Sequence, residues 1–302
     1  MLLLIIFEDM DEKVHIQLML LCVVNVIFTC AGTFLNLLVI VSFWRSSVYL
    51  RSKLCYFMIM VLSFFDFLVV ITNHPILILR AIVWLKERND LLAMVQIYGH
   101  FSNVFIGFSI LALLVMSLER YLGAYYPFFH RTSLTKRRLL TLLAVLFLAT
   151  IILGIISMND LVITYAAVLI IFFLIAFPPF LFFNYKLFMI SRKVRRDIAR
   201  RRNNTSSPEI STLHVNLKKI STCLLAVGCL LFMYIPAFSF IAVNFVKKST
   251  SENAKVVHLW AGTLGNGTST VNCLIFFWKN DVLRREGKKT VKALKDSFKF
   301  AS

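Results

Sequence analysis

The sequence predicts an all-α protein, a bundle of seven transmembrane helices followed by a short amphipathic helix. The first reason is composition: 59% of the 302 residues are hydrophobic and 16% are charged, against about 25% charged residues in soluble domains. The second is a series of seven apolar stretches, each long enough to cross a hydrocarbon core of about 30 Å, which takes about 20 helical residues. The third is that basic residues gather between alternate stretches.

The apolar stretches define the predicted spans and the domain limits. A seven-span domain (16–279) lies between a short extracellular N-terminus (1–15) and a cytoplasmic helix with its tail (280–302). In this last segment, apolar residues are interleaved with lysine and arginine, which is typical of an amphipathic helix on a membrane surface. The predicted spans are residues 16–43, 54–79, 91–122, 139–157, 161–190, 217–246 and 255–279.

Lysine and arginine orient the predicted bundle. Most of the 33 basic residues fall near the inner ends of the first, third and fifth spans, in the loops that follow them, and in the C-terminal tail. Because basic loops stay on the cytoplasmic side, the N-terminus is predicted outside and the C-terminus inside. The formal charge of +18 then forms a cytoplasmic fringe, which suits anionic membrane lipids and acidic protein surfaces rather than nucleic acid.

Glu119-Arg120-Tyr121 ends the third span on its predicted cytoplasmic side. The carboxylate of Glu119 can hold the guanidinium of Arg120 where hydrocarbon gives way to cytoplasm, and can release it to a partner that enters from below. The three residues are therefore a candidate switch. The alternative is an arginine that only extends to the lipid headgroups.

Asp66 is the only acidic residue well inside a predicted span. Asn36, Ser109 and Asn272, on the first, third and seventh spans, lie at comparable depth by residue count. A carboxylate with neutral oxygen ligands suits a small cation, and sodium at Asp66 is the one metal ion that the pattern suggests. The alternative is a neutral, hydrogen-bonded aspartate that only holds helices together.

Prolines interrupt two of the predicted spans. Pro178-Pro179 lies in the fifth span and Pro236 in the sixth, and each frees backbone carbonyls and bends its helix. The two spans are therefore candidate levers, with Pro236 as a hinge. Proline is also common in membrane helices that have no switching role.

Motifs along nearly the whole chain resemble those of the rhodopsin-like (class A) G-protein-coupled receptors. Taken together, in order and at sensible spacing, they are specific. They are the first-helix pattern Gly32-Thr33-Phe34-Leu35-Asn36, the second-helix motif Leu62-Ser63-Phe64-Phe65-Asp66, the triplet Glu119-Arg120-Tyr121, and Pro127 in the second inner loop.

The resemblance implies a plasma-membrane receptor with no enzymatic activity and no cofactor. Such a receptor passes the signal of an extracellular ligand to a heterotrimeric G protein when helix six swings outward, and Arg120 would then contact the G protein. Asp66 would belong to the family's allosteric sodium site. Tyr185 on helix five would contribute its hydroxyl to the switch.

Three departures from the family pattern bear on signalling. Tyr234 takes the aromatic toggle position before Pro236, where the family usually has tryptophan. Phe276 replaces the tyrosine of the seventh-helix motif that begins at Asn272, so the family's tyrosine hydroxyl is missing there. The sequence also lacks the usual disulfide cysteines of helix three and the second outer loop, which is nearly absent. The last feature resembles melanocortin and adenosine-type receptors.

The predicted ligand site lies in the outer half of the bundle. The family's amine-binding aspartate falls at Ser102, and a buried ammonium without a carboxylate loses its counter-charge. We therefore expect a small neutral or lipid-like ligand. The alternative for each polar residue is a hydrogen bond between helices. The candidate ligand contacts are His100, Ser102, Asn103, Phe238, Thr263 and Asn266.

Two other functions stay open from the sequence. One is a seven-helix protein that has lost signalling and acts as a decoy or chaperone. The other is a small membrane transporter, which would be expected to show internal repeats and several charged residues at mid-membrane, where this chain has only Asp66.

The inner end of the sixth span bears on basal activity. The position where some relatives carry an acidic helix-six residue falls near Asn216, beside Lys218 and Lys219. An ionic latch to Arg120 is therefore not expected, and the sequence predicts raised basal activity.

Overall fold

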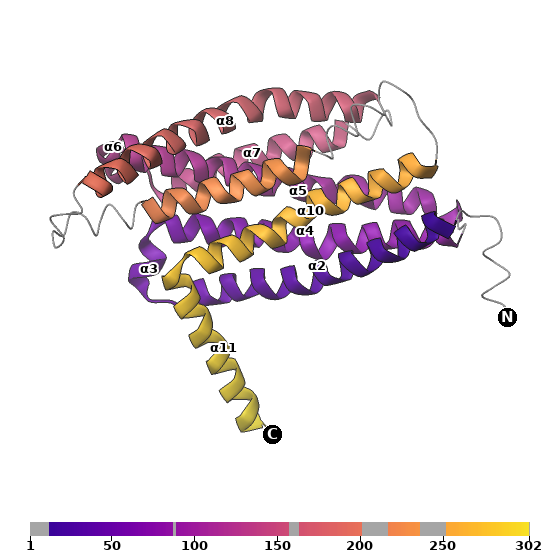
Figure 1. Cartoon of the computed structure of the whole chain (residues 1–302), viewed down its shortest axis with the longest axis horizontal. Helices are drawn as coiled ribbons and strands as arrows, with labels where there is room; N and C mark the ends of the chain where they lie inside the picture. The colour runs from indigo at the N-terminus through magenta and orange to yellow at the C-terminus, as the bar shows by residue number, and fades with distance from the viewer. Residues whose placement is uncertain (1–11, 87–88, 157–162, 201–216, 236–251, 302) are drawn as a thin grey trace.

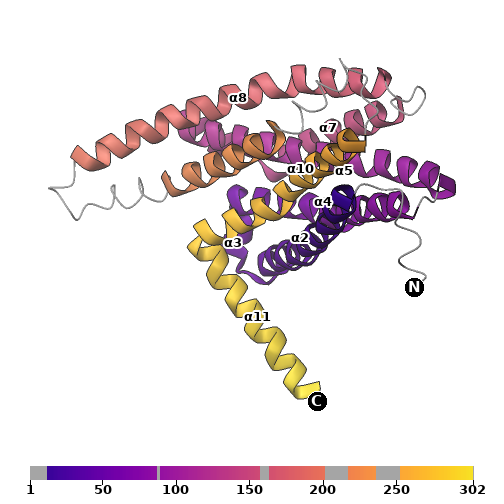
Figure 2. The same cartoon turned by 45° about the vertical axis from the view of Figure 1, so that its right-hand side comes forward.

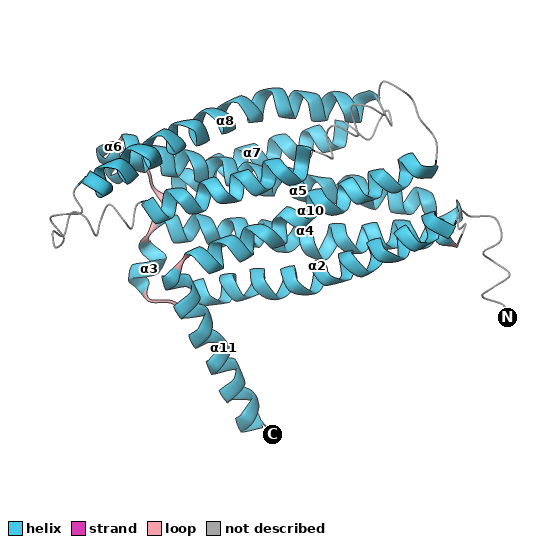
Figure 3. Ribbon diagram, in the orientation of Figure 1, coloured by secondary structure: helices cyan, strands magenta, loops and turns pink. Residues whose placement is uncertain are grey.

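The computed structural model describes residues 12–86, 89–156, 163–200, 217–235 and 252–301. Within these ranges the regular structure is entirely helical, and the long helices lie side by side along one direction (Figures 1 and 3). The all-α prediction is therefore confirmed. The short helices α3 (Val48–Ser52) and α6 (Pro127–Thr132) mark one end of the bundle, which we call the inner end. The opposite end is called the outer end.

Helices form at all seven predicted spans. The sixth is described over Leu217–Ile235 and is called the sixth-span helix below. The fifth runs to residue 200, past its predicted end at 190, as a basic extension. The other six are α2 (Glu12–Arg45), α4 (Leu54–Leu85), α5 (Asn89–Tyr125), α7 (Lys136–Ile156), α8 (Ile163–Arg200) and α10 (Glu252–Lys279).

Several of these helices have the length and hydropathy of a membrane crossing. Because an α-helix rises 1.5 Å per residue, about 20 residues cross the hydrocarbon core. Among the described residues, the stretches that satisfy both criteria are Glu12–Arg45, Leu54–Leu85, Val104–Tyr125 and Leu217–Ile235.

The side chains are distributed as in a protein surrounded by lipid. The largest buried cluster joins several of the long helices and includes Met58, Leu113 and Met116. Large apolar side chains also cover the outside, and Trp44 is 61% exposed and Phe232 79% exposed. Since hydrocarbon is as apolar as a protein core, an exposed apolar face is what a membrane helix presents to lipid.

Gly32 lets α2 approach α4 and α10 closely. A Cβ atom at this position would lie 2.5 Å from Oγ1 of Thr270 and 2.8 Å from Cγ2 of Val70. Membrane helices pack through small residues because the association gains little from burying apolar surface. The glycine therefore sets the helix spacing next to the buried polar residues described below.

The predicted helix after the seventh span is present as α11 (Asp281–Ala301), which turns away from the bundle direction (Figures 1 and 2). It packs against α2 and α10 near its start. Gly287 allows this contact, because a Cβ atom there would lie 2.5 Å from Cε2 of Phe277.

The two short helices at the inner end were not predicted. Ser47 caps α3 by accepting a hydrogen bond from the backbone N–H of Leu50 at 3.4 Å. Pro127 occupies the first turn of α6, where a proline loses no helical hydrogen bond. Both helices are far shorter than the apolar runs of about 20 residues by which the spans were found.

Candidate functional site

Asp66 lies at the centre of a buried polar cluster between three spans. Its side chain belongs to α4 and is 1% exposed. The hydroxyl of Ser109 on α5 donates to Oδ1 of Asp66, and Nδ2 of Asn272 on α10 donates to Oδ2 at 3.4 Å. Ser269, one helical turn before Asn272, also hydrogen bonds to the carboxyl group. The structure thus brings together two of the three predicted partners and adds Ser269.

Asn36 reaches this cluster indirectly. Its side chain is fully buried, and Nδ2 donates to the carbonyl of Gly32 at 2.9 Å and to the carbonyl of Ser269 at 3.5 Å. Asn36 therefore fixes the backbone of α10 at the residue that contacts Asp66. The amide oxygens of Asn36 and Asn272 are buried and accept no hydrogen bond from the described residues.

The donor set of this cluster fits a small hard cation. It consists of carboxylate, hydroxyl and amide oxygens, which are the ligands that alkali and alkaline-earth ions prefer. Two buried oxygens without a donor add acceptor capacity at the same place,. The residues that would hold the ion are Asp66, Ser109, Ser269, Asn36 and Asn272.

Glu119 and Arg120 form a second polar cluster at the inner end of α5. Glu119 is 2% exposed, and its Oε2 lies 3.3 Å from Nε of Arg120 in an ion pair. The geometry of this pair is not that of a hydrogen bond. Nη2 of Arg120 donates to the carbonyl of Cys55 on α4 at 3.4 Å. The guanidinium is therefore held by a charge attraction to Glu119 of its own helix and by one long hydrogen bond to the backbone of α4,.

His130 completes this cluster, and sequence reasoning missed it. Its Nε2 lies 2.9 Å from Oε1 of Glu119, because α6 folds back against the inner end of α5. Pro127 at the start of α6 was the available signal, since it marks a new helix whose next turn carries His130. Glu119 therefore has one partner on each of its two oxygens.

The inner halves of three spans meet at a small polar contact above this cluster. Ser117 on α5 shares hydrogen bonds with Asn184 on α8, with Nδ2 of Asn184 3.3 Å from the hydroxyl. The same hydroxyl lies 3.6 Å from the sulfur of Cys223 on the sixth-span helix. These neutral contacts connect the helix that carries Arg120 to the two predicted levers.

The two predicted tyrosines of the switch are placed differently. Tyr121 packs its ring against Phe183 of α8, with ring centroids 5.3 Å apart. Tyr185 is 61% exposed on α8, whereas its neighbour Asn184 faces α5. The structure therefore does not bring Tyr185 to Arg120.

The toggle residue Tyr234 packs against the seventh span. A Cβ atom at Gly265 of α10 would lie 3.4 Å from Cε1 of Tyr234, so this glycine gives the ring its place between the two helices. The predicted hinge Pro236 lies outside the described residues.

Two predicted ligand contacts form hydrogen bonds between helices. Thr263 is fully buried and accepts from Nδ2 of Asn25 at 2.8 Å, and Nδ1 of His74 donates to Oδ1 of Asn25 at 2.6 Å. Nearby, Nδ2 of Asn73 donates to Oδ1 of Asn266 at 3.1 Å. We call the side chains of Asn25, Asn73, His74, Thr263 and Asn266 the outer network.

The remaining predicted ligand contacts are only partly described. His100, Ser102 and Asn103 belong to the helical backbone of α5, and their side chains lie outside the described part of the chain. Phe238 lies outside the described residues altogether. Thr263 and Asn266 are therefore the predicted ligand contacts whose hydrogen bonds are known.

The inner end of the sixth-span helix is tied to α11. Nζ of Lys218 donates to Oδ2 of Asp281 at 2.9 Å, and both side chains are well exposed. Arg284 binds the other oxygen of the same carboxylate at 2.6 Å. The hydrogen bond from Lys218 holds the pKa of Asp281 below its usual range. Asn216 lies outside the described residues.

Comparison with known protein families agrees with this geometry. The sequence model of the seven-transmembrane receptors of the rhodopsin family matches residues 35–276, a region that contains both polar clusters and the seventh-span motif. A search of the curated proteins finds no match. Because the matched region covers most of the chain, this multi-pass membrane protein belongs to the rhodopsin family of seven-transmembrane receptors.

Proposed function

We propose that this chain passes the signal of an extracellular ligand to a heterotrimeric G protein by outward movement of the sixth-span helix. The observation that carries the proposal is Arg120, a cation at the inner end whose side chain is 9% exposed and whose contacts among the described residues are Glu119 at 3.3 Å and the carbonyl of Cys55 at 3.4 Å. A guanidinium forms charge-assisted hydrogen bonds with carboxylate oxygens, so an acidic group of a partner protein can compete with Glu119 for Arg120. The remaining partner of Glu119, His130, keeps the carboxylate hydrogen bonded when Arg120 leaves.

The polar contacts of the sixth-span helix support its role as the moving part. Its Cys223 contacts the hydroxyl of Ser117 on α5 through sulfur, a weak acceptor and donor,. At its inner end the contact is the exposed pair of Lys218 and Asp281, and exposed ion pairs contribute little to stability. Neither contact opposes an outward swing strongly, and we expect raised basal nucleotide exchange.

The central cluster around Asp66 is the proposed allosteric sodium site. A sodium ion held by Asp66, Ser109 and the nearby amide oxygens would join α4, α5 and α10 in their present arrangement. Binding to one arrangement only would shift the population towards it. Sodium is therefore expected to lower basal exchange.

The proposed orientation follows the charge distribution. The C-terminus and the basic inner loops face the cytoplasm and the N-terminus lies outside. The proposed plasma-membrane location follows from the proposed role as a receptor for an extracellular ligand. The ligand enters from the outer end and is small and neutral or lipid-like, since the amine-binding position holds Ser102. Its contacts with His100, Asn103 and Phe238 are part of the proposal.

Nucleotide exchange on purified G proteins tests this function. Membranes that contain the chain should accelerate nucleotide exchange on at least one of a broad set of G proteins. With Arg120→Ala, the rate should fall to that of empty membranes. Arg131→Ala is the matched control, because Arg131 is an exposed arginine of α6. A rate equal to that of empty membranes for every G protein would contradict the proposal.

A non-signalling decoy or chaperone is the second candidate function. It is favoured by Phe276, which is 3% exposed in the largest core cluster and has no hydroxyl to offer an active arrangement. A variant that restores the hydroxyl separates the two functions. If Phe276→Tyr creates exchange activity that the natural chain lacks, the chain is a seven-helix protein that has lost signalling.

A further inference from the structure

A groove of about 880 Å³ lies between the inner halves of α2, α4 and α7. Sites for small molecules commonly have volumes of about 300 to 1,000 Å³. Its lining contains none of the side chains proposed above for signalling or sodium binding. The groove is therefore a separate feature of the inner end.

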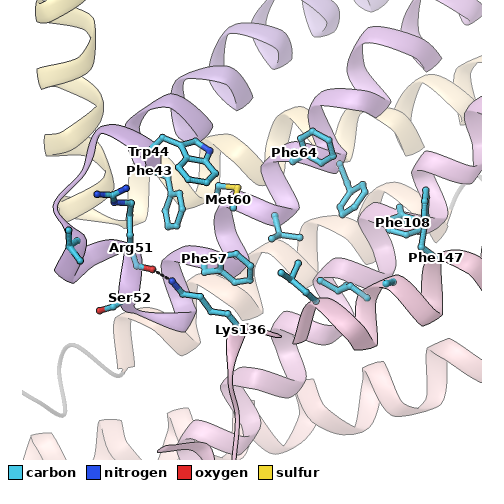
Figure 4. A pocket seen from close by; sticks show the side chains of 16 residues that line it. Phe43, Trp44, Arg51, Ser52, Phe57, Met60, Phe64, Phe108, Lys136 and Phe147 are labelled. Atoms are coloured by element: carbon cyan, nitrogen blue, oxygen red, sulfur yellow. Dashed lines mark hydrogen bonds between the residues drawn. The ribbon is translucent and has the colours of Figure 1, made fainter. Parts of the chain in front are cut away.

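The two ends of this groove differ in chemistry (Figure 4). Arg51 and Ser52 of α3 and Lys136 of α7 lie at one end. Phe108 and Phe147 lie at the other, with their rings edge to face and 3.7 Å between centroids. A ligand that fits both ends has a polar head and a long apolar tail.

The groove opens towards the surrounding lipid. Four side chains of its lining are among the exposed apolar residues: Val48 is 73% exposed, Trp44 61%, Leu140 47% and Phe64 45%. In a bilayer such side chains face the acyl chains. A lipid can therefore enter sideways without crossing the bundle.

The polar end of the groove is positively charged. Nε of Arg51 is buried and has no hydrogen-bond partner among the described residues. Lys136 donates to the backbone carbonyl of Arg51, and its ammonium lies 5.4 Å from the ring centroid of Phe57. None of the lining residues is acidic. A buried guanidinium N–H without an acceptor is unfavourable, so an anionic oxygen at this end would be stabilised.

We propose that this groove binds an anionic phospholipid of the cytoplasmic leaflet. The net negative headgroup, with its carboxylate or phosphate oxygens, binds Arg51 and Lys136, and one acyl chain lies along the aromatic wall towards Phe147. The cytoplasmic leaflet carries the anionic lipids of a plasma membrane, and this choice of leaflet rests on the orientation proposed above. The binding itself goes beyond the proposed signalling and does not depend on it.

Lipid binding to the purified full chain tests the charged end. Native mass spectrometry in detergent would compare phosphatidylserine with phosphatidylcholine of the same acyl chains. We expect phosphatidylserine to bind about tenfold more tightly, as one charge-assisted hydrogen bond would give. Arg51→Gln and Lys136→Gln should remove this preference. Arg137→Gln is the matched control and should keep it, because Arg137 is an exposed neighbour on α7 that does not line the groove.

A second variant tests the apolar end without changing any charge. Ala144→Trp fills the groove from α7 and should weaken phosphatidylserine binding, whereas Leu142→Trp, on an exposed position outside the lining, should not. Thermal unfolding without added lipid would verify that each variant is folded. Equal binding of the two lipids by the natural chain, or binding by folded Arg51→Gln and Ala144→Trp at the natural strength, would overturn the proposal. Failure of G-protein exchange would leave it intact, since binding is measured without a G protein.

Discussion

The outer network and the inner cluster of Glu119, Arg120 and His130 are both buried and polar, and they are built differently. The outer network uses neutral groups at good distances, 2.6 Å from His74 to Asn25 and 2.8 Å from Asn25 to Thr263. The inner cluster uses charged groups, and its central ion pair is 3.3 Å long without hydrogen-bond geometry.

The difference indicates which end of the bundle is fixed and which can change. Neutral hydrogen bonds between membrane helices contribute about 0.6 to 2 kcal/mol each and have one good geometry. A buried charge that is only loosely paired has a strong tendency to find a better partner. The outer network therefore holds α2, α4 and α10 together, and the inner cluster is ready to rearrange.

Removing the cation from the inner cluster should have the largest effect. Arg120→Ala is expected to abolish G-protein activation, because no other group at the inner end of α5 could replace its contact with a partner. The variant leaves the buried carboxylate of Glu119 with His130 as its remaining partner, so we expect some loss of thermal stability, and exchange is compared per folded molecule. If a folded Arg120→Ala variant exchanged nucleotide at the natural rate, Arg120 would have no role in signalling. The inner cluster would then be only structural, like the outer network.

Neutralising the carboxylate of Glu119 should raise basal exchange, whereas removing Arg120 should abolish it. Glu119→Gln keeps the shape of the side chain and its contact with His130 but removes the charge that attracts Arg120. We expect basal exchange to rise about tenfold, which corresponds to roughly 1.4 kcal/mol. The measurement is the initial rate of nucleotide exchange at equal protein levels. A fall in the rate would show that Glu119 supports the active arrangement instead.

A change in the outer network should affect stability and leave the inner cluster unaffected. Asn25→Leu leaves His74 and Thr263 without their shared partner, and we expect the free energy of unfolding to fall by about 1 to 2 kcal/mol. Basal exchange per folded molecule should be unchanged. Thr29→Val is the control, because Thr29 bonds only within its own helix, to the carbonyl of Asn25. An equal loss for both variants would refute the structural role of the network.

The smallest effect is expected at the exposed pair of Lys218 and Asp281. Asp281→Asn should raise basal exchange slightly, and by less than Glu119→Gln, because solvent screens the pair,. Lys218 holds the pKa of Asp281 below its usual range, so the pair is intact at neutral pH. It is lost only as the pH falls through that lowered pKa. Between pH 6 and pH 8, the basal exchange rates of the natural chain and of Asp281→Asn should therefore change with pH in the same way.

The number and order of the spanning helices could be predicted because membrane spans have a simple signal. A run of about 20 apolar residues is sufficient, and it needs no knowledge of neighbouring helices. The basic tail with interleaved apolar residues likewise indicated α11. Helices α3 and α6 were missed because five or six residues carry no comparable signal.

The contacts of the polar residues were harder to predict because the sequence of a lipid-exposed helix does not show which of its faces points into the bundle. In α2 the exposed Phe34 and the buried Asn36 reverse the pattern of a soluble helix, so hydropathy does not show which face is inside. The position of each residue along its predicted span was enough to group Ser109 and Asn272 with Asp66. It could not show that Asn184, and not its neighbour Tyr185, faces α5.

The central claim is that the inner end of the sixth-span helix moves away from Arg120 when a transducer binds. Spin labels at the exposed positions Ala124 on α5 and Leu225 on the sixth-span helix would report this distance by pulsed electron resonance. The account predicts a longer distance with a nucleotide-free G protein bound than without it, and no such increase in Arg120→Ala. The same distance distribution in both states of the natural chain would contradict it.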